Sequence, residues 1–206
     1  RLVLLNRHSP VLGEHAFSAD HEQAGRLAAM ALLSHGHREI AVIQGHRDAP
    51  DNHDRMRGFH AELGRHGVQV KPQHHVDGTF SFVSGYAGAE QLLSQHDQSY
   101  TAVFCANDVM AMAAITRFIQ AGRRVPQDVS VIGYDDTDIA AYTAPPLTTV
   151  RIPMDKVTTN ACRYLLNMCY ALNLPVERDF APHVVWRGSV GQGPHRPLDL
   201  TTVARS

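Results

Sequence analysis

Residues 101–136, TAVFCANDVMAMAAITRFIQAGRRVPQDVSVIGYDD, contain a strand, a helix and a second strand in succession. The apolar runs Thr101–Cys105 and Val129–Gly133 predict two buried strands. Asn107 or Asp108 is placed to cap the helix between them. A helix that joins two apolar strands is typical of a parallel sheet, whose strands are covered on both faces.

The same alternation extends along the chain in both directions. Further strands are predicted at Leu2–Leu5, Glu39–Gln44, His74–Asp77, Leu147–Arg151 and Val184–Trp186. Further helices are predicted from Asp20 to Gly36, around Phe59 and Leu63 up to Gly67, over about Val83–Gln95 and over about Met154–Leu172. Asp20 can cap the first of these helices, with Gln23 as its capping-box partner. The sequence therefore predicts an α/β fold with doubly wound parallel sheets.

The composition is that of a globular protein and argues against several classes. The chain has 206 residues, 44% of them hydrophobic and 19% charged, which suits one large or two small domains. The formal net charge of -1 supplies no basic field for a nucleic-acid backbone, so this stretch alone is not expected to bind DNA. No apolar run of about 18 residues is present, which argues against a membrane span.

The cysteines and histidines indicate no metal site. The three cysteines form no CxxC pair, which fits free thiols in a reducing compartment, the cytoplasm. Cys162 and Cys169 lie seven residues apart on a predicted helix, so they are expected to share a face in the core. The histidines at neighbouring positions lack the spacing of metal ligands and are expected in solvated turns. They are His35, His37, His74 and His75.

Ligands of doubly wound sheets bind beyond the carboxyl ends of the strands. Four side chains near such strand ends together offer the groups that bind a sugar. Asn107 offers a donor and an acceptor, Asp135 offers two acceptors, Arg55 offers a fork of donors, and Phe80 can lie flat on an apolar sugar face. Each of these side chains can instead have a purely structural role. Asn107 can be only a helix cap, Arg55 a surface residue, Phe80 a core residue, and Asp135 the cap of a short helix.

Catalytic interpretations have less support. The Asp136-Thr137-Asp138 sequence faintly resembles the phosphoryl-transfer motif of haloacid dehalogenases, but it comes late in the chain. No GxSxG elbow, HExxH helix or glycine-rich phosphate loop is present. We therefore expect no enzyme activity, no cofactor and no metal.

Several tracts together resemble the lactose/galactose repressor family. They are the runs at 101–111, 125–136 and 144–151, together with LSHGHREIAVI at 33–43 and RMRGF at 55–59. They keep the order of the family and span roughly residues 2 to 188. The Asn6-Arg7 tract and the loop that contains Pro50 are most similar to galactose and β-glucoside repressors.

The resemblance implies a two-lobed core like that of periplasmic sugar-binding proteins. Residues 1–19 and 152–185 correspond to part of the N-terminal lobe, which is incomplete in this chain. Residues 20–151 and 186–190 correspond to the C-terminal lobe, and 191–206 to a flexible tail. The DNA-binding headpiece of the family is absent. Members dimerise, some form tetramers, and they bind operator DNA through the headpiece.

The resemblance also implies which residues bind the effector. By position, Arg55, Asn107 and Asp135 match the polar effector ligands and Phe80 the stacking aromatic. Asp51 matches a more variable polar contact, and Asn6 matches a variable strand-end position of the opposite lobe. Asp20 matches a residue near the crossing between the lobes. The expected function is a sugar-responsive transcriptional repressor without contact to membranes. The alternative is a periplasmic sugar-binding protein of a transporter, which shares the fold.

Overall fold

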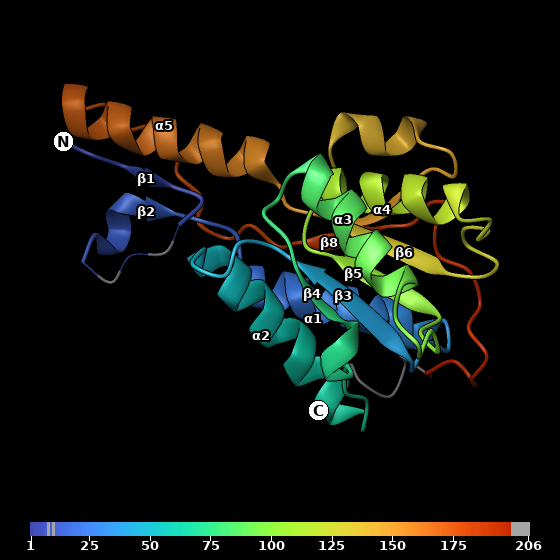
Figure 1. The fold of residues 1–206 in the computed structure, drawn as a ribbon. Helices are drawn as coiled ribbons and strands as arrows, with labels where there is room; N and C mark the ends of the chain where they lie inside the picture. Colours follow the sequence, from blue (N-terminus) through green and yellow to red (C-terminus); the bar gives the residue numbers. More distant parts are fainter. Residues whose placement is uncertain (8, 10, 199–206) are drawn as a thin grey trace.

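The computed structural model describes residues 1–7, 9 and 11–198. Its main feature is a six-stranded sheet with the order β4-β3-β5-β6-β7-β8 (Figure 1). The strands are β3 (Ile40–Gln44), β4 (His75–Asp77), β5 (Ala102–Cys105), β6 (Ser130–Asp135), β7 (Thr148–Arg151) and β8 (His183–Val185). Neighbouring strands are parallel except β7 and β8. The sheet therefore has the predicted α/β, mostly parallel architecture.

Helices cover both faces of this sheet. They are α1 (His21–Ser34), α2 (Pro50–Arg65), α3 (Phe82–Leu93) and α4 (Asp108–Gln120). Alternate residues of β3 point to opposite faces: Ile40 and Val42 pack with α1 and α2, whereas Ala41 and Ile43 pack with α3 and α4. Two hydrophobic cores result, one on each face of the sheet.

A second, smaller unit lies beside the first, at the left of Figure 1. It consists of β1 (Leu4–Leu5) and β2 (Ala16–Phe17), which are parallel, and α5 (Met154–Tyr170), which packs against them. The predicted strand at Leu2–Leu5 is thus shorter than expected, and β2 lies in a stretch with no strand prediction. A two-residue strand has too few residues to show an alternating pattern.

The end of the described chain differs from expectation. β8 pairs with β7 and so belongs to the six-stranded sheet, which moves residues 183–185 out of the smaller unit. The proposed flexible tail is ordered by hydrogen bonds up to residue 198, because the backbone amides of Gly193 and His195 donate to the carbonyls of His35 and Gly36. The remainder, 199–206, lies outside the described residues.

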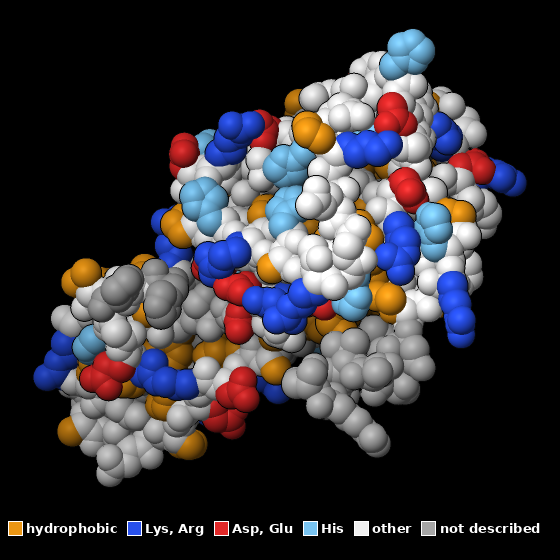
Figure 2. All heavy atoms as spheres, turned by 90° about the horizontal axis from the view of Figure 1, so that it is seen from below, with side chains coloured by type: hydrophobic (Ala, Val, Ile, Leu, Met, Phe, Trp, Pro, Cys, Tyr) orange, Lys and Arg blue, Asp and Glu red, His pale blue; other side chains and the backbone are white. Residues whose placement is uncertain are grey.

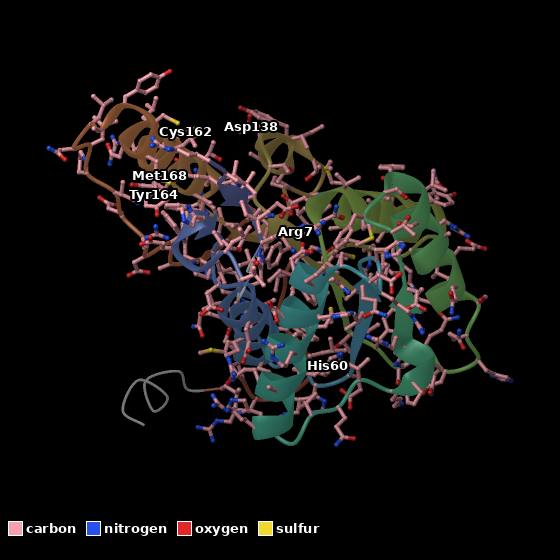
Figure 3. The ribbon with its side chains drawn as sticks, turned by 90° about the vertical axis from the view of Figure 1, so that its left-hand side faces the viewer. Arg7, His60, Asp138, Cys162, Tyr164 and Met168 are labelled. Carbon is pink, nitrogen blue, oxygen red and sulfur yellow. The ribbon has the colours of Figure 1, made fainter. Side chains whose placement is uncertain are left out.

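Burial of the cysteines and histidines also differs from expectation. Cys162 and Cys169 are exposed, and only Cys105 is buried; Figure 3 shows Cys162 on α5. The buried face of α5 is formed instead by Val157, Asn160 and Ala161. His37 and His74, expected in solvated turns, are buried and hydrogen-bonded. A polar side chain can enter the core where its polar atoms find partners.

Three short 3-10 helices complete the described fold. One 3-10 helix spans Gly13–His15 in the smaller unit, and others span Pro72–His74 and Asp138–Tyr142. The Asp138–Tyr142 helix follows β6 and lies on the α4 side of the sheet in Figure 1.

Candidate functional site

Arg55 lies at the centre of the candidate site. It is in the second turn of α2 and is 3% exposed. Its guanidinium carbon is 3.5 Å from the centroid of the Tyr134 ring. One guanidinium nitrogen donates to the Ala106 carbonyl, and another donates to Asp51 Oδ2 at 3.4 Å. The buried Nε has no hydrogen-bond partner among the described residues, so Arg55 retains one unused donor.

Phe80 and Asn107 lie beside this arginine. The Phe80 ring is 5.7 Å from the Arg55 guanidinium and lies directly over Gly45, where any Cβ would clash with it. Asn107 Oδ1 accepts from the Met110 amide at 2.9 Å, which confirms its role as a helix cap. Its Nδ2 donates to the Phe80 carbonyl at 3.0 Å. The same amide therefore starts α4 and holds the backbone of Phe80.

Asp135 ends β6, and its carboxyl interacts electrostatically with Arg55 and Asp51. The residue reaches solvent on one side, yet protein atoms crowd the carboxyl on the others. This desolvation raises the pKa of Asp135 to about 7, while Arg55 acts to lower it. A carboxyl group that changes charge near neutral pH is typical of functional sites.

Backbone strain is concentrated here. Among the described residues, five that are not glycine have a positive φ. Four of them are in or next to this region: Asn6 at 54°, Phe80 at 61°, Asp135 at 115° and Asp136 at 57°. Such conformations cost about 1–3 kcal/mol each and persist where the surroundings enforce them, often at binding sites.

A hydrogen-bonded chain joins the smaller unit to the larger one. The His21 ring contacts Asn6 Oδ1 through Nε2 at 3.1 Å and the Tyr134 hydroxyl through Nδ1 at 2.7 Å. Asp20, the preceding residue, accepts from the Gln23 amide at 2.8 Å and so caps α1 as predicted. Asn6 thus reaches the cluster through His21 and Tyr134.

A cavity of about 520 Å³ opens where the two units meet. Its walls come from the first turns of α1 and α2, from the smaller unit and from the segment 178–182. Figure 3 shows Arg7, one of the lining residues, at this junction. Of the predicted site residues, Asp20 and Asp51 line the cavity, whereas five do not. The five are Asn6, Arg55, Phe80, Asn107 and Asp135.

The predicted residues therefore form two adjoining groups. Arg55, Phe80, Asn107 and Asp135 lie together at the strand ends, and Asp20 and Asp51 lie in the cavity wall. The contact between Arg55 and Asp51 connects the two groups.

Sequence reasoning missed two central side chains, His21 and Tyr134. Both are buried, and both are adjacent to residues that were predicted, Asp20 and Asp135. Arg178 was missed as well: its guanidinium lies 4.2 Å from the Phe17 ring and fixes the wall of the cavity. Adjacency to a predicted residue was the only available signal for His21 and Tyr134, and Arg178 had no such signal. The partners of these side chains are up to 164 residues away in the sequence.

The described residues contain neither a metal-ligand cluster nor a helix that could span a membrane. No group of three or more histidine, cysteine or acidic side chains among them could hold a metal ion. No helix in the described part is both long and apolar enough to cross a bilayer. In Figure 2 acidic and basic side chains are intermixed over the visible face.

Comparison with known proteins identifies the family. Residues 29–190 match the family model of the periplasmic binding protein-like domain. The helix-turn-helix-type transcriptional repressor PurR of Photobacterium profundum is 39% identical over 145 residues, which are 70% of this chain and 43% of that protein. The PurR of Aliivibrio fischeri is 38% identical over 82% of this chain and 51% of its own length. The chain thus spans about half the length of these curated relatives.

Solved structures agree with this assignment. A LacI-family transcriptional regulator from Burkhoderia phymatum superposes with a TM-score of 0.87 at 46% identity, over 92% of this chain and 69% of that one. A sugar-binding LacI-family regulator from Escherichia coli, complexed with phosphate, gives 0.86 at 31% identity, over 93% and 68%. The chain belongs to the periplasmic-binding-protein-like domain family, among the transcriptional regulators of the LacI family.

Proposed function

We propose that this chain is the effector-binding core of a sugar-responsive transcriptional repressor. The observation that carries the proposal is the cavity of about 520 Å³ between the two units, directly beside the cluster of Arg55, Phe80 and Asp135. Relatives of this chain are transcriptional repressors, which supports regulation over the alternative of transport.

The two units correspond to two lobes in this proposal. Residues 1–19 and 152–182 belong to the smaller lobe, of which this chain contains a part. Residues 20–151 and β8 belong to the larger lobe. The cavity lies at the crossings between them. An effector that contacts both lobes stabilises one closure angle. It shifts the population only if it binds the open and closed states with different affinity.

The side chains favour a polyhydroxylated effector. Asp51 and Asp135 supply acceptors, the unused Arg55 Nε supplies a donor, and the Phe80 ring supplies an apolar plate. A sugar presents both hydroxyl groups and apolar ring faces to such a set. Unpaired buried polar groups cost about 1–3 kcal/mol each, so the site discriminates between sugars by their stereochemistry.

The partners follow from the same proposal. The protein contacts operator DNA through a headpiece outside this chain, acts in the cytoplasm without membranes, metals or cofactors, and catalyses no reaction. It forms a homodimer, with a tetramer as the larger alternative. Exposed apolar side chains on α3, α4 and the Asp138–Tyr142 helix support self-association. They are Phe82, Val83, Ile119, Ile139 and Tyr142.

Titration calorimetry of the protein with D-glucose, D-galactose, D-ribose, cellobiose and the bases adenine and guanine tests the proposal. Binding of at least one sugar is expected, and Asp51→Ala weakens it about tenfold, the loss typical of a removed polar contact. Glu90→Ala, a substitution of an exposed acidic residue of α3 outside the cavity wall, serves as the control. Binding of a purine base alone overturns the sugar assignment. Binding of none of the six overturns the sensing function.

A further inference from the structure

His21 occupies the point where the smaller unit meets the larger one. Its side chain is 6% exposed, although it stands in the first turn of α1. Its two ring nitrogens contact partners 15 and 113 residues away along the chain, Asn6 and Tyr134. Asn6 follows β1 of the smaller sheet, whereas Tyr134 lies in β6 of the larger one. A single imidazole thus bridges the two sheets.

The hydrogen-bonding partners of His21 indicate which ring nitrogen carries the hydrogen. Asn6 Oδ1 can only accept a hydrogen bond, so His21 Nε2 carries the hydrogen and donates to it. His21 Nδ1 is then unprotonated and accepts from the Tyr134 hydroxyl at 2.7 Å. Of the two neutral forms of the ring, only the one that carries its hydrogen on Nε2 makes both bonds at once.

The bridge continues beyond Tyr134 to the cavity. The hydroxyl bond fixes the Tyr134 ring, and the Arg55 guanidinium lies over that ring at 3.5 Å. Arg55 in turn contacts Asp51 in the cavity wall. Among the described residues Arg55 has no acidic partner closer than Asp51 Oδ2 at 3.4 Å, so its orientation is set by the Tyr134 ring together with the Ala106 carbonyl.

We propose that His21 is a positioning residue of the effector site, which couples the placement of Asn6 in one lobe to the placement of Arg55 in the other. This inference rests on the proposed function, since it assigns His21 a part in the response of that same site. The relay consists of Asn6, His21, Tyr134 and Arg55. Effector contacts that move Arg55 are transmitted through it to the smaller unit.

The charges around His21 keep the ring in the required state. Burial is the main cause that lowers the pKa of His21, and the Arg55 cation adds to it. Asp51, Asp54 and Asp20 act in the opposite direction. A proton on Nδ1 reverses the bond to Tyr134, because the ring then donates to the hydroxyl oxygen, and it places a second cation beside Arg55. Protonation of His21 therefore weakens the relay through repulsion between these two cations.

Two substitutions separate the halves of the relay. His21→Asn places its amide near the position of Nδ1 and keeps the bond to Tyr134, whereas His21→Gln reaches the position of Nε2 and keeps the bond to Asn6. If both halves are needed, each variant binds the effector sugar about tenfold more weakly, as for one lost buried hydrogen bond. His53→Asn, an exposed histidine of α2, is the matched control and leaves binding unchanged.

Three readouts distinguish this role from simple packing. The dissociation constant of the unsubstituted protein rises below pH 6.5 more steeply than that of His21→Asn. The nitrogen chemical shifts of His21 report the ring with hydrogen on Nε2. Without any effector, Asn6→Gly, which tolerates the positive φ of this position, and Tyr134→Phe lower Tm together by less than the sum of their separate shifts.

The outcomes separate the relay from the proposed function. If neither a sugar nor a purine base binds the unsubstituted protein, the sensing function is overturned, and the chemical shifts and the Tm values still test the relay. If sugar binds the two His21 variants as tightly as the unsubstituted protein, the positioning role is overturned. Additive Tm shifts, or a hydrogen on Nδ1 instead of Nε2, overturn the relay in either case.

Discussion

The planar Arg55 guanidinium lies over the Tyr134 ring, with its carbon 3.5 Å from the ring centroid, and both side chains are almost completely buried. This stack brings a permanent cation to the carboxyl end of β6, beside Asp135. The charge is compensated by an aromatic face and by the Ala106 carbonyl as well as by Asp51. These partners leave the buried Nε without a hydrogen bond to the described residues.

Arg55→Lys tests the importance of the planar group. Lysine keeps the charge but cannot stack on Tyr134 or donate in two directions, so we expect a loss of about 1–3 kcal/mol in the free energy of unfolding. Effector binding is expected to fall by more than tenfold. Urea unfolding and calorimetry measure the two effects. A lysine variant with unchanged stability and affinity contradicts this role.

Asp135→Asn tests the raised pKa of this carboxyl. The folded pKa of about 7 lies above the unfolded value, so this group favours folding at low pH and the contribution is lost as pH rises through 7. The asparagine variant therefore gains stability relative to the unsubstituted protein at pH 8 but not at pH 5. Solvent screens the partly exposed carboxyl, so the gain is of the order of 1 kcal/mol. Thermal unfolding of both proteins at both pH values provides the measurement. If the Tm difference between Asp135→Asn and the unsubstituted protein is the same at pH 5 and pH 8, the raised pKa of Asp135 is refuted.

Acid is expected to destabilise the fold through four histidines. Burial lowers the pKa of each below 6.5, so the folded state keeps them neutral. They are His21, His37, His60 and His75. The unfolded chain takes up these protons first, and stability falls as pH drops below 6.5, by about 1.4 kcal/mol per pH unit for each proton taken up on unfolding. Urea titrations at pH 7.5, 6.5 and 5.5 measure the slope. His37→Asn reduces it, and an unchanged slope in that variant excludes His37 as a contributor.

Gly25 and Gly64 give a matched pair of alanine substitutions in helices. A Cβ on Gly25 of α1 clashes with the Arg55 carbonyl of α2, whereas a Cβ on Gly64 of α2 meets no atom within 4 Å. Gly25→Ala is expected to cost about 1–3 kcal/mol through overpacking. Gly64→Ala is expected to stabilise the protein by about 0.5–1 kcal/mol, since alanine has the higher helix propensity. Similar unfolding midpoints for the two variants argue against the close crossing of α1 and α2.

Thiol labelling tests the placement of the three cysteines. Cys162 and Cys169 are exposed on α5, whereas Cys105 is in the interior of β5, and burial raises the pKa of its thiol. The folded protein is expected to react with two equivalents of a thiol reagent, and the urea-unfolded protein with three. A single fast equivalent in the folded state contradicts the exposed position of one of the two cysteines of α5.

Local patterns in the sequence determined the elements and their order. The apolar runs at 101–105 and 129–133 predicted β5 and β6 because residues covered on both faces must all be apolar. Asp20 and Asn107 were recognised as helix caps from the residues that follow them. The rule that ligands bind at the carboxyl ends of parallel strands placed Arg55, Phe80 and Asp135 in one region.

Tertiary structure alone decided which side chains meet. Two-residue strands such as β2 carry no periodic pattern, and the cysteines of α5 could be placed inside or outside only once the neighbours of that helix were known. His21 and Tyr134 are 113 residues apart, and nothing near either residue in the sequence encodes their 2.7 Å contact. Such pairs form because the sheet and helices assemble as a whole, and a buried donor or acceptor is then stable only where a distant partner satisfies it.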